Sequence, residues 1–318
     1  MKLIEVSDLQ KHFAIGNQTI KAIKQMSFTI NQGEFISIMG PSGSGKTTLM
    51  NIIGCLDSPT SGSYSLDNNE VASLTDDELA EIRNKKIGFV FQSFHLLARN
   101  TALQNVLLPL SYAGFDKKSA IEKAKLALSR VGLEDRMDHK PSELSGGQQQ
   151  RVGIARSLAV EPDIWFLDEP FSALDPLIRK EMQDEFLRLQ GVLNKTIMFV
   201  THDFDEALRL ADRIAIMKDG IIEQLDTPGN IVLNPATDYV KKFTEDVPRE
   251  KVLRIESIMD AQDPNASDTL EVSKDDIIET VAEKILNSKE IIKVTDPKDK
   301  SIVGSINPSK VIKVLFGG

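Results

Sequence analysis

Two short segments contain residues whose types and spacing could handle a polyphosphate. In the first, Gly40–Thr47, the order Gly-x-x-x-x-Gly-Lys-Thr lies between an apolar strand pattern at Glu34–Met39 and a helical pattern at Lys46–Leu56. This context predicts a phosphate-binding loop, because glycines let successive N–H groups face the phosphates and the helix N-terminus adds a favourable dipole. We expect Lys46 to reach the β- and γ-phosphates and Thr47 to offer its hydroxyl to Mg²⁺. The residues expected to contact the nucleotide here are Gly40, Pro41, Ser42, Gly43, Ser44, Gly45, Lys46, Thr47 and Thr48.

The second segment is a pair of adjacent carboxylates, Asp168 and Glu169, directly after the apolar run Ile164–Leu167. Alone, such a pair is commonly a strand end meeting solvent. With a phosphate loop in the same chain, the carboxyl end of a parallel strand is the place where ligands bind. We therefore expect Asp168 to hold Mg²⁺, usually through water, and Glu169 to position or deprotonate the water that attacks the γ-phosphate.

A parallel sheet covered by helices is predicted to position these segments. Compact apolar strands at 164–167, 197–200 and 214–217 alternate with helical periodicity at 177–193 and 204–210. Before the phosphate loop, period-two alternation predicts antiparallel strands at 3–9 and 26–30. From about 101 to 160 the strand patterns disappear and helical periodicity replaces them, so a helical insertion is predicted there.

The segment Leu144–Arg151, with the sequence Leu-Ser-Gly-Gly-Gln-Gln-Gln-Arg at the start of a predicted helix, resembles the signature motif of ATP-binding cassette (ABC) ATPases. A serine N-cap accounts for Ser145 alone but not for the whole string. The resemblance implies that this motif binds the γ-phosphate held by an opposite subunit, so each ATP site needs two cassettes. The residues concerned are Ser145, Gly146, Gly147 and Gln148.

Further positions match the family in the same order along the chain. Gln92, in Phe89–Phe94, resembles the glutamine that touches Mg²⁺ and water and signals to the membrane subunits. Asp175, in Ser172-Ala173-Leu174-Asp175, resembles the loop residue that contacts the partner subunit, and His202 resembles the switch histidine on the γ-phosphate. Phe13 stands where the family stacks an aromatic ring on adenine, but it could equally pack in a strand core. Trp165, on the strand before the carboxylates, is assigned to the core.

The resemblance implies an α/β fold: a phosphate-loop NTPase cassette with a RecA-like core, an antiparallel β subdomain and an inserted helical subdomain. We expect the ATPase domain at 1–245, with the helical subdomain at about 94–160, and a polar linker at 246–268. The order of strand, helix, strand, strand and helix at 269–318 resembles a single cystathionine-β-synthase (CBS)-like module, a small α+β appendage. In relatives, paired modules sense ionic strength or bind a nucleotide, and with one copy here a pair would have to form across the dimer. A purely stabilising or dimerising appendage is the alternative.

The type of transporter is indicated by two resemblances that disagree. The stretches Phe171–Glu185 and Thr227–Ile231 are very similar to ATPases of glycine betaine and proline betaine importers. The earlier stretch Leu49–Gly62 looks more like ATPases of lipoprotein-release and macrolide-efflux systems. Because those exporter ATPases usually end soon after the cassette, the tail favours an osmoprotectant importer, with the exporter as the alternative. A soluble ABC ATPase of translation or repair and a nucleotide sensor without turnover are weaker alternatives.

Composition limits the partners. The net charge of −9 argues against a nucleic-acid partner, and the single Cys55, within an apolar stretch, is expected to be a buried small residue in a reducing compartment. No apolar run approaches the roughly 18 residues that cross a bilayer. The family resemblance implies the partners: a homodimer or paired cassette at the cytoplasmic face of the cell membrane, with integral membrane permease subunits and an extracytoplasmic substrate-binding protein, using ATP and Mg²⁺.

Overall fold

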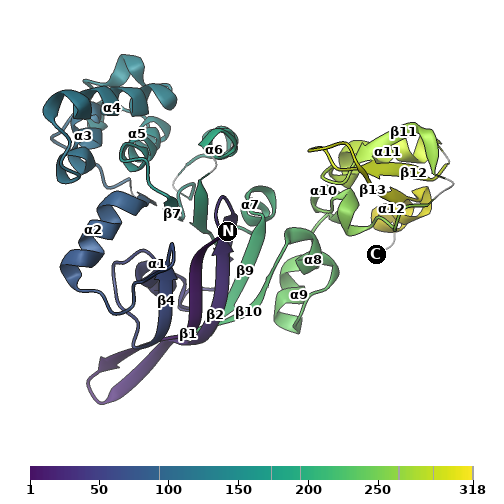
Figure 1. Ribbon diagram of the computed structural model, residues 1–318, viewed down its shortest axis with the longest axis horizontal. Coiled ribbons are helices and arrows are strands. Elements are labelled where there is room, and N and C mark those ends of the chain that lie inside the picture. Colours follow the sequence, from purple (N-terminus) through teal and green to yellow (C-terminus); the bar gives the residue numbers. More distant parts are fainter. Residues whose placement is uncertain (93, 173, 194, 264–265, 289, 317–318) are drawn as a thin grey trace. The chain divides into compact units, whose positions relative to one another are not determined.

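The chain forms two compact units, residues 1–222 and 223–318, and each is described by itself (Figure 1). The division lies within strand β10 (Ile221–Asp226), earlier in the chain than the boundary after residue 245 that the sequence suggests. None of the described helices is long and apolar enough to pass through a bilayer. The computed structural model describes residues 1–92, 94–172, 174–193, 195–263, 266–288 and 290–316.

The first unit begins with a four-stranded antiparallel sheet in the order β2-β1-β4-β5. A turn at Gly16, whose φ is 59°, joins β1 and β2 into a hairpin longer than the alternating pattern predicts. Both strands continue beyond their buried parts because backbone pairing extends them to the turn, where Phe13 pairs with Ile20. The strands are β1 (Lys2–Ile15), β2 (Gln18–Asn31), β4 (Ser61–Leu66) and β5 (Asn69–Glu70).

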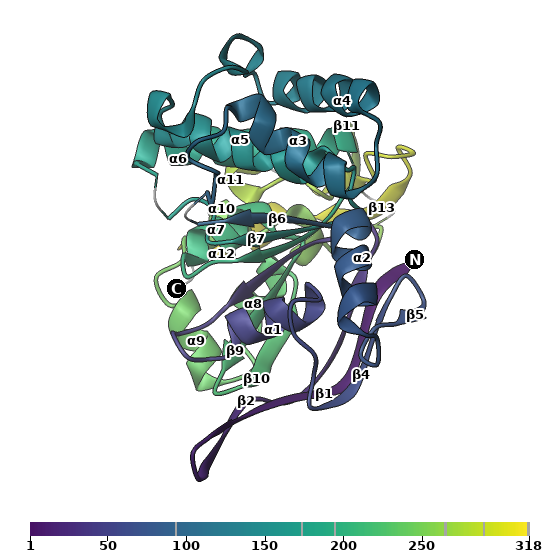
Figure 2. The same ribbon diagram turned by 90° about the vertical axis from the view of Figure 1, so that its left-hand side faces the viewer.

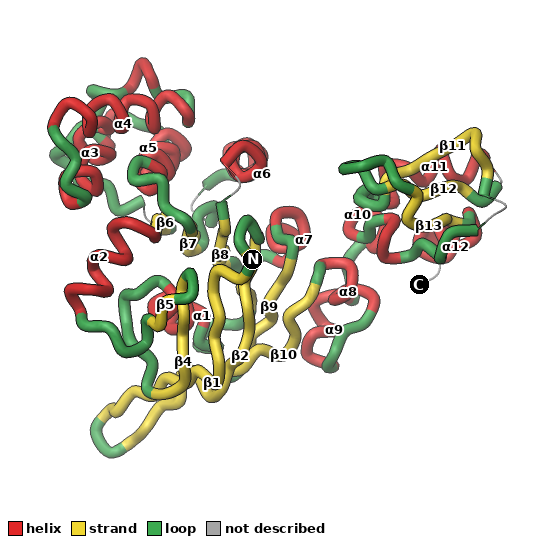
Figure 3. Tube along the Cα trace, in the orientation of Figure 1, coloured by secondary structure: helices red, strands yellow, loops and turns green. Residues whose placement is uncertain are grey.

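The centre of this unit is a sheet with the strand order β9-β3-β8-β7-β6, shown in yellow in Figure 3. The strands from β9 to β6 are parallel, and every residue of β3 and β8 is buried, as expected for a sheet covered on both faces. This confirms the predicted covered parallel sheet. The strands are β3 (Phe35–Met39), β6 (Ile87–Phe91), β7 (Ile164–Asp168), β8 (Thr196–Val200) and β9 (Arg213–Lys218).

Helices α1 (Lys46–Ile53), α6 (Pro176–Leu193) and α7 (Phe204–Leu210) follow β3, β7 and β8 respectively, as the sequence predicts. Helix α2 (Asp76–Lys86) was not predicted, because only Leu79 on it is buried and no apolar stripe marks it. Its stability comes instead from its ends: Thr75 and the glutamate three residues later form a capping box, with acidic residues in the first turn and basic ones in the last.

A helical segment follows β6, and Figure 2 shows its helices packed together at one end of the unit. The stretch from residue 101 to 158, which the structure describes completely, contains helices and no strands, as predicted. Its last helix begins at the signature motif. The helices are α3 (Ala102–Tyr112), α4 (Lys117–Arg130) and α5 (Gly146–Leu158), with short 3-10 turns at Glu134–Arg136 and Pro141–Glu143.

The second unit ends in the predicted order of strand, helix, strand, strand and helix. Strand β11 pairs with β12 in parallel, and β12 pairs with β13 in antiparallel fashion. Before this module the unit contains the short helices α8 (Pro228–Leu233), α9 (Asp238–Thr244) and α10 (Arg249–Val252). The module itself consists of β11 (Ser267–Ser273), α11 (Ile278–Ser288), β12 (Ile292–Thr295), β13 (Ile302–Ile306) and α12 (Pro308–Phe316).

The segment 246–268, which the sequence suggests as a linker, is built into the fold of the second unit. Leu253 and Ile255 have no exposed surface and pack in one apolar cluster with residues of α11, α12 and all three strands. Asp260 exchanges backbone hydrogen bonds with Ser305, at 2.8 and 3.1 Å. Polar composition suggested a linker here, but these few apolar residues bind the segment to the module. Pro264, within this segment, lies outside the described residues.

Candidate functional site

The phosphate loop follows the end of β3, and its path depends on glycine. Gly40, Gly43 and Gly45 have φ values of 146°, 81° and 102°, which side-chain-bearing residues rarely adopt. A Cβ on Gly40 would lie 2.2 Å from the carbonyl oxygen of Met217, and one on Gly45 would lie 2.6 Å from that of Ala22. The backbones of β9 and β2 therefore pack directly against the loop and leave no room for a side chain at Gly40 or Gly45. This close packing holds the loop backbone in its positive-φ conformation.

The polar groups of this loop fit a polyphosphate. The Lys46 ammonium folds over the loop and donates to the carbonyl oxygens of Gly40 and Pro41 at 2.8 and 3.0 Å. Burial lowers the pKa of Lys46, while Glu169 and Asp168 act in the opposite direction. The buried hydroxyl of Ser44 has no hydrogen-bond partner among the described residues. A phosphate bound to the loop would give the Lys46 ammonium a charged acceptor, whereas Ser44 is not among the residues that line the open cleft around the loop.

The carboxylates lie at the end of β7, next to the end of β8. Asp168 pairs with Val200 across the two strands, and burial raises the pKa of Asp168, with Glu169 adding to the rise and Lys46 opposing it. Glu169 has a left-handed backbone, with φ of 44°. Its N–H donates to Val200 O at 2.9 Å, and its carbonyl accepts from the Ser172 hydroxyl at 2.9 Å. These bonds hold a conformation that is costly for a glutamate, as is common at functional sites.

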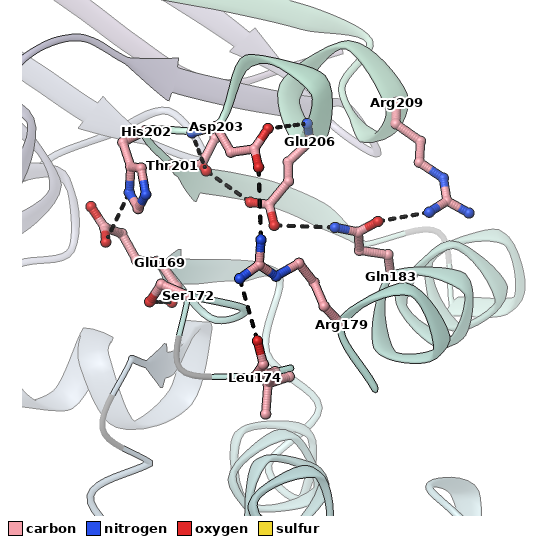
Figure 4. A network of polar contacts seen from close by, with 10 residues as sticks. All are labelled: Glu169, Ser172, Leu174, Arg179, Gln183, Thr201, His202, Asp203, Glu206 and Arg209. Carbon is pink, nitrogen blue, oxygen red and sulfur yellow. Dashed lines mark hydrogen bonds and ion pairs between the residues drawn. The ribbon is translucent and has the colours of Figure 1, made fainter. Parts of the chain in front are cut away.

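His202, just after β8, lies beside Glu169, just after β7, as Figure 4 shows. Its Nδ1 is 3.2 Å from Glu169 Oε2, and 65% of its side chain is exposed. The imidazole is therefore held near the carboxylate but remains free to turn toward a phosphate in the cleft. Two motifs that are 33 positions apart in the printed numbering meet here because β7 and β8 are adjacent and parallel.

A solvent-open cleft of about 890 Å³ unites the loop, the carboxylates and the histidine. It brings together most residues predicted from sequence: Phe13, Gly40, Pro41, Ser42, Gly43, Gly45, Lys46, Thr47, Thr48, Asp168, Glu169 and His202. Sequence reasoning missed the lining residues on β2 and in the turn after β9, and Val200 at the end of β8 also lines the cleft. The missed residues are Ile20, Lys21, Ala22, Lys24, Asp219 and Gly220. A hydrogen bond of 2.9 Å from Lys24 N to Gly220 O joins the two missed segments.

The site offers oxygen donors suited to Mg²⁺ in the Thr47 hydroxyl and the Asp168 carboxylate. Among the described residues there is no group of three or more His, Cys, Asp or Glu side chains that could hold a metal alone. Two protein oxygens match a cation that keeps several waters and takes its remaining ligands from the phosphates of a nucleotide. The Gln92 side chain is exposed just after β6 and is not among the residues lining the cleft.

The signature residues and Asp175 do not reach this cleft. Ser145 caps α5 and forms a capping box with Gln148, and Ser145 and Gly146 are exposed. Asp175 is exposed and caps α6 by accepting from the N–H groups of Leu177 and Ile178 at 3.2 Å each. Exposure away from the chain's own cleft agrees with the expected action on an opposite subunit, which stays a prediction. Ser93 and Ala173, in the two loop motifs, lie outside the described residues.

Phe13 faces the cleft and is not part of the strand core, since it is 39% exposed. The Lys11 ammonium lies 5.1 Å from the centre of its ring and is itself held by Asp57 at 2.6 Å and by Ser58 O at 2.7 Å. By contrast, Trp165 has no exposed surface and stacks edge-on against Phe186, as its core assignment predicts. Cys55 is buried too, and burial raises its pKa to about 11.

If Phe13 stacks on adenine, Phe13→Ala should weaken ATP binding by about five- to thirtyfold, the usual effect of losing an aromatic platform under a base. Phe13→Trp should bind ATP at least as well as the native chain, because it keeps a flat aromatic face. Calorimetric titration with ATP measures both. Ile20→Ala, on the paired strand and also in the cleft, is the control; an equal loss there would show that the hairpin surface, not the ring, matters.

The comparisons with known proteins agree with this geometry. The family described as ABC transporter matches residues 23–172. The chain is 59% identical over 300 residues to TmoW of Pelagibacter ubique strain HTCC1062, a trimethylamine N-oxide transport system ATP-binding protein, covering 94% of this chain and 88% of that protein. The chain belongs to the ABC transporter ATPase family.

Two further ABC proteins illustrate the likeness. OpuAA of Bacillus subtilis strain 168, a glycine betaine transport ATP-binding protein, is 44% identical over 291 residues, covering 92% of this chain and 68% of that protein. The cassette MJ0796, solved as a dimer bound to ADP and Pi, has a TM-score of 0.65 and 43% identity, covering 71% of this chain and 98% of that one. The present chain, as a member of this family, binds ATP and couples ATP hydrolysis to transport.

Proposed function

We propose that this ABC ATPase drives the import of a small methylated amine, with trimethylamine N-oxide preferred and glycine betaine the second candidate. The observation that carries the proposal is the length of the likeness: TmoW matches over 94% of the chain, so the similarity includes most of the second unit as well as the cassette. OpuAA also matches over 92%, at lower identity. Both relatives are ATP-binding proteins of transport systems, which favours a transporter over a role in translation or repair.

In the proposed reaction the loop N–H groups and Lys46 hold the β- and γ-phosphates. Thr47 and Asp168 would hold a Mg²⁺ ion, which supplies positive charge against the phosphates when bound. Gln92, just after β6, would have to move into the cleft to reach that ion. Glu169 orients the attacking water and accepts its proton. His202, 3.2 Å from Glu169, turns to donate a hydrogen bond to the γ-phosphate as negative charge spreads over its oxygens.

The complete site is proposed to form between two cassettes. Residues Ser145–Gln148 of one copy would contact the γ-phosphate held by the other, and Asp175 would contact the partner across the interface. A nucleotide that touches both copies binds the closed pair better than the open one, and so shifts the population toward closure. Permease subunits would hold the pair at the cytoplasmic face of the cell membrane, and a substrate-binding protein would deliver the amine on the other side.

The second unit is proposed to regulate transport or to stabilise the dimer. Its final strand, helix, strand, strand and helix are compatible with one CBS-like module, and its apolar cluster makes it a folded body with its own core. In such a body, a response to ionic strength would act through surface charge, which salt screens. Salt dependence of transport therefore separates a regulatory module from a stabilising one.

The test is uptake by the chain reconstituted in liposomes with its permease and substrate-binding protein. ATP inside should drive uptake of radiolabelled trimethylamine N-oxide above that of glycine betaine, and Glu169→Gln should abolish both. Preference for glycine betaine would correct the substrate within the same class. ATP hydrolysis without uptake of either compound would contradict the importer and favour an exporter. Stimulation by internal salt would give the second unit a regulatory role.

A further inference from the structure

Beyond the ATP cleft, a buried acid lies behind the turn that carries His202. Glu206, in the first turn of α7, is 7% exposed. Its carboxylate accepts a hydrogen bond from the Thr201 hydroxyl at 2.8 Å and another from the Gln183 amide of α6 at 3.1 Å. Burial raises the pKa of Glu206, while these hydrogen bonds oppose the rise. A buried acid with two donors forms a rigid junction between the two helices and the end of β8.

The residues on both sides of His202 belong to this junction. Thr201 Oγ1 accepts from the Asp203 N–H at 3.0 Å, and Asp203 Oδ1 accepts from the Glu206 N–H at 3.2 Å (Figure 4). The backbone of His202 is therefore held before and after it, while its side chain stays mostly exposed. The placement of His202 therefore depends on the position of this junction.

Arg179 joins the same junction to the loop expected to face a partner. It lies at the end of the first turn of α6, the helix that follows that loop, and its Nη2 donates to Leu174 O at 3.3 Å. Its Nη1 lies 3.9 Å from Asp203 Oδ2, an ion pair about 1 Å longer than a hydrogen bond. The planar guanidinium can serve two acceptors at fixed angles, so a shift of Leu174 would be passed to Asp203.

We infer that Arg179 is a positioning residue that makes the placement of His202 follow the position of Leu174 in the loop 172–175. The inference rests on the proposed role of His202 in hydrolysis. Contact between this loop and a second cassette would bring Arg179 closer to Asp203. That shift would orient His202 toward the γ-phosphate. Hydrolysis would thereby depend on the presence of a partner even where His202 belongs to the same chain.

The kinetic test uses Arg179→Met, which keeps the length of the side chain but removes both contacts. We expect kcat to fall about five- to twentyfold, in the range of a single coupling between sites, and the Kd for ATP to change less than about twofold. Arg179→Lys keeps one charge without the fork and should recover part of the loss. It also serves as the test should the methionine variant be poorly folded. Arg188→Met, on the same helix with a side chain paired to Glu185, is the matched control.

A double-mutant cycle separates this inference from the proposed function. Because Arg179 would act through His202, Arg179→Met should add less than about a twofold loss in a His202→Ala background, measured by single-turnover hydrolysis. If His202→Ala hydrolyses ATP slowly and Arg179→Met still lowers the hydrolysis rate by the same factor in that background, the inference is wrong but the catalytic role of His202 stands. Wild-type turnover by His202→Ala would overturn the proposed catalytic role, and the inference with it.

A spectroscopic test needs no activity. The chain has four histidines, so histidine-selective carbon labelling gives a spectrum in which loss of one signal in His202→Ala assigns that residue. Arg179→Met should shift the His202 signal and leave those of His12, His95 and His139 in place. An unchanged His202 signal in a folded Arg179→Met variant would contradict the inference.

Discussion

Glu169→Gln is expected to slow ATP hydrolysis by about 10²- to 10⁴-fold while leaving ATP binding nearly unchanged. The amide has the same shape as the carboxylate but cannot accept the proton of the attacking water. It can also keep the contact with His202, 3.2 Å away in the native chain, so the surroundings of the cleft should be preserved. Because ATP would bind without being consumed, the variant should accumulate as a dimer, which light scattering after gel filtration with ATP and Mg²⁺ detects.

Glu161→Gln is the matched control, because Glu161 is exposed and shares the unusual left-handed backbone, with φ of 55° against 44° for Glu169. This control separates the chemistry of the carboxylate from any effect of placing an amide on such a backbone. Unchanged turnover in Glu169→Gln would remove the residue from the catalytic assignment. Equal losses in both variants would indicate a structural effect.

Lys46→Met is expected to raise the Kd for ATP by about ten- to a hundredfold, since a charge-assisted hydrogen bond contributes about 1.5–3 kcal/mol. Methionine keeps the apolar stem of the side chain but loses the ammonium that folds over the loop at 2.8 Å from Gly40 O. Calorimetric titration with ATP and Mg²⁺ measures the change. Hydrolysis should fall in parallel at subsaturating ATP.

Lys21→Met supplies the comparison, because Lys21 also lines the cleft but is exposed on β2, outside the phosphate loop. It should weaken binding by less than about threefold, the effect of a screened surface charge. If the two variants weakened binding equally, the general positive charge of the cleft would explain the affinity. A specific role of Lys46 would then be rejected.

The fold was predictable where the signal is local. The segment of strand, loop and helix around Gly40–Lys46 is encoded by a short apolar run, three glycines and a helical pattern, all within reach of one another. Apolar periodicity does not predict helix α2, because the sequence signal for this helix is its capping box, formed by Thr75 and Glu78. The polar composition of the segment 246–268 predicts a linker, but two apolar residues, Leu253 and Ile255, are enough to anchor it in the core of the second unit.

The sequence by itself determined that this protein binds nucleotide phosphates. The phosphate-binding groups lie in the consecutive residues 40–47, so they can be recognised without knowing how the rest of the chain folds. Only the tertiary structure decided which side chains share the cleft. The order β3-β8-β7 brings Lys46, Glu169 and His202 together, and the β1–β2 hairpin adds Phe13 to the same cleft. Strand order and hairpin placement depend on packing between segments far apart in the chain. For the same reason, the connection from Leu174 through Arg179 to His202 cannot be read from any local pattern.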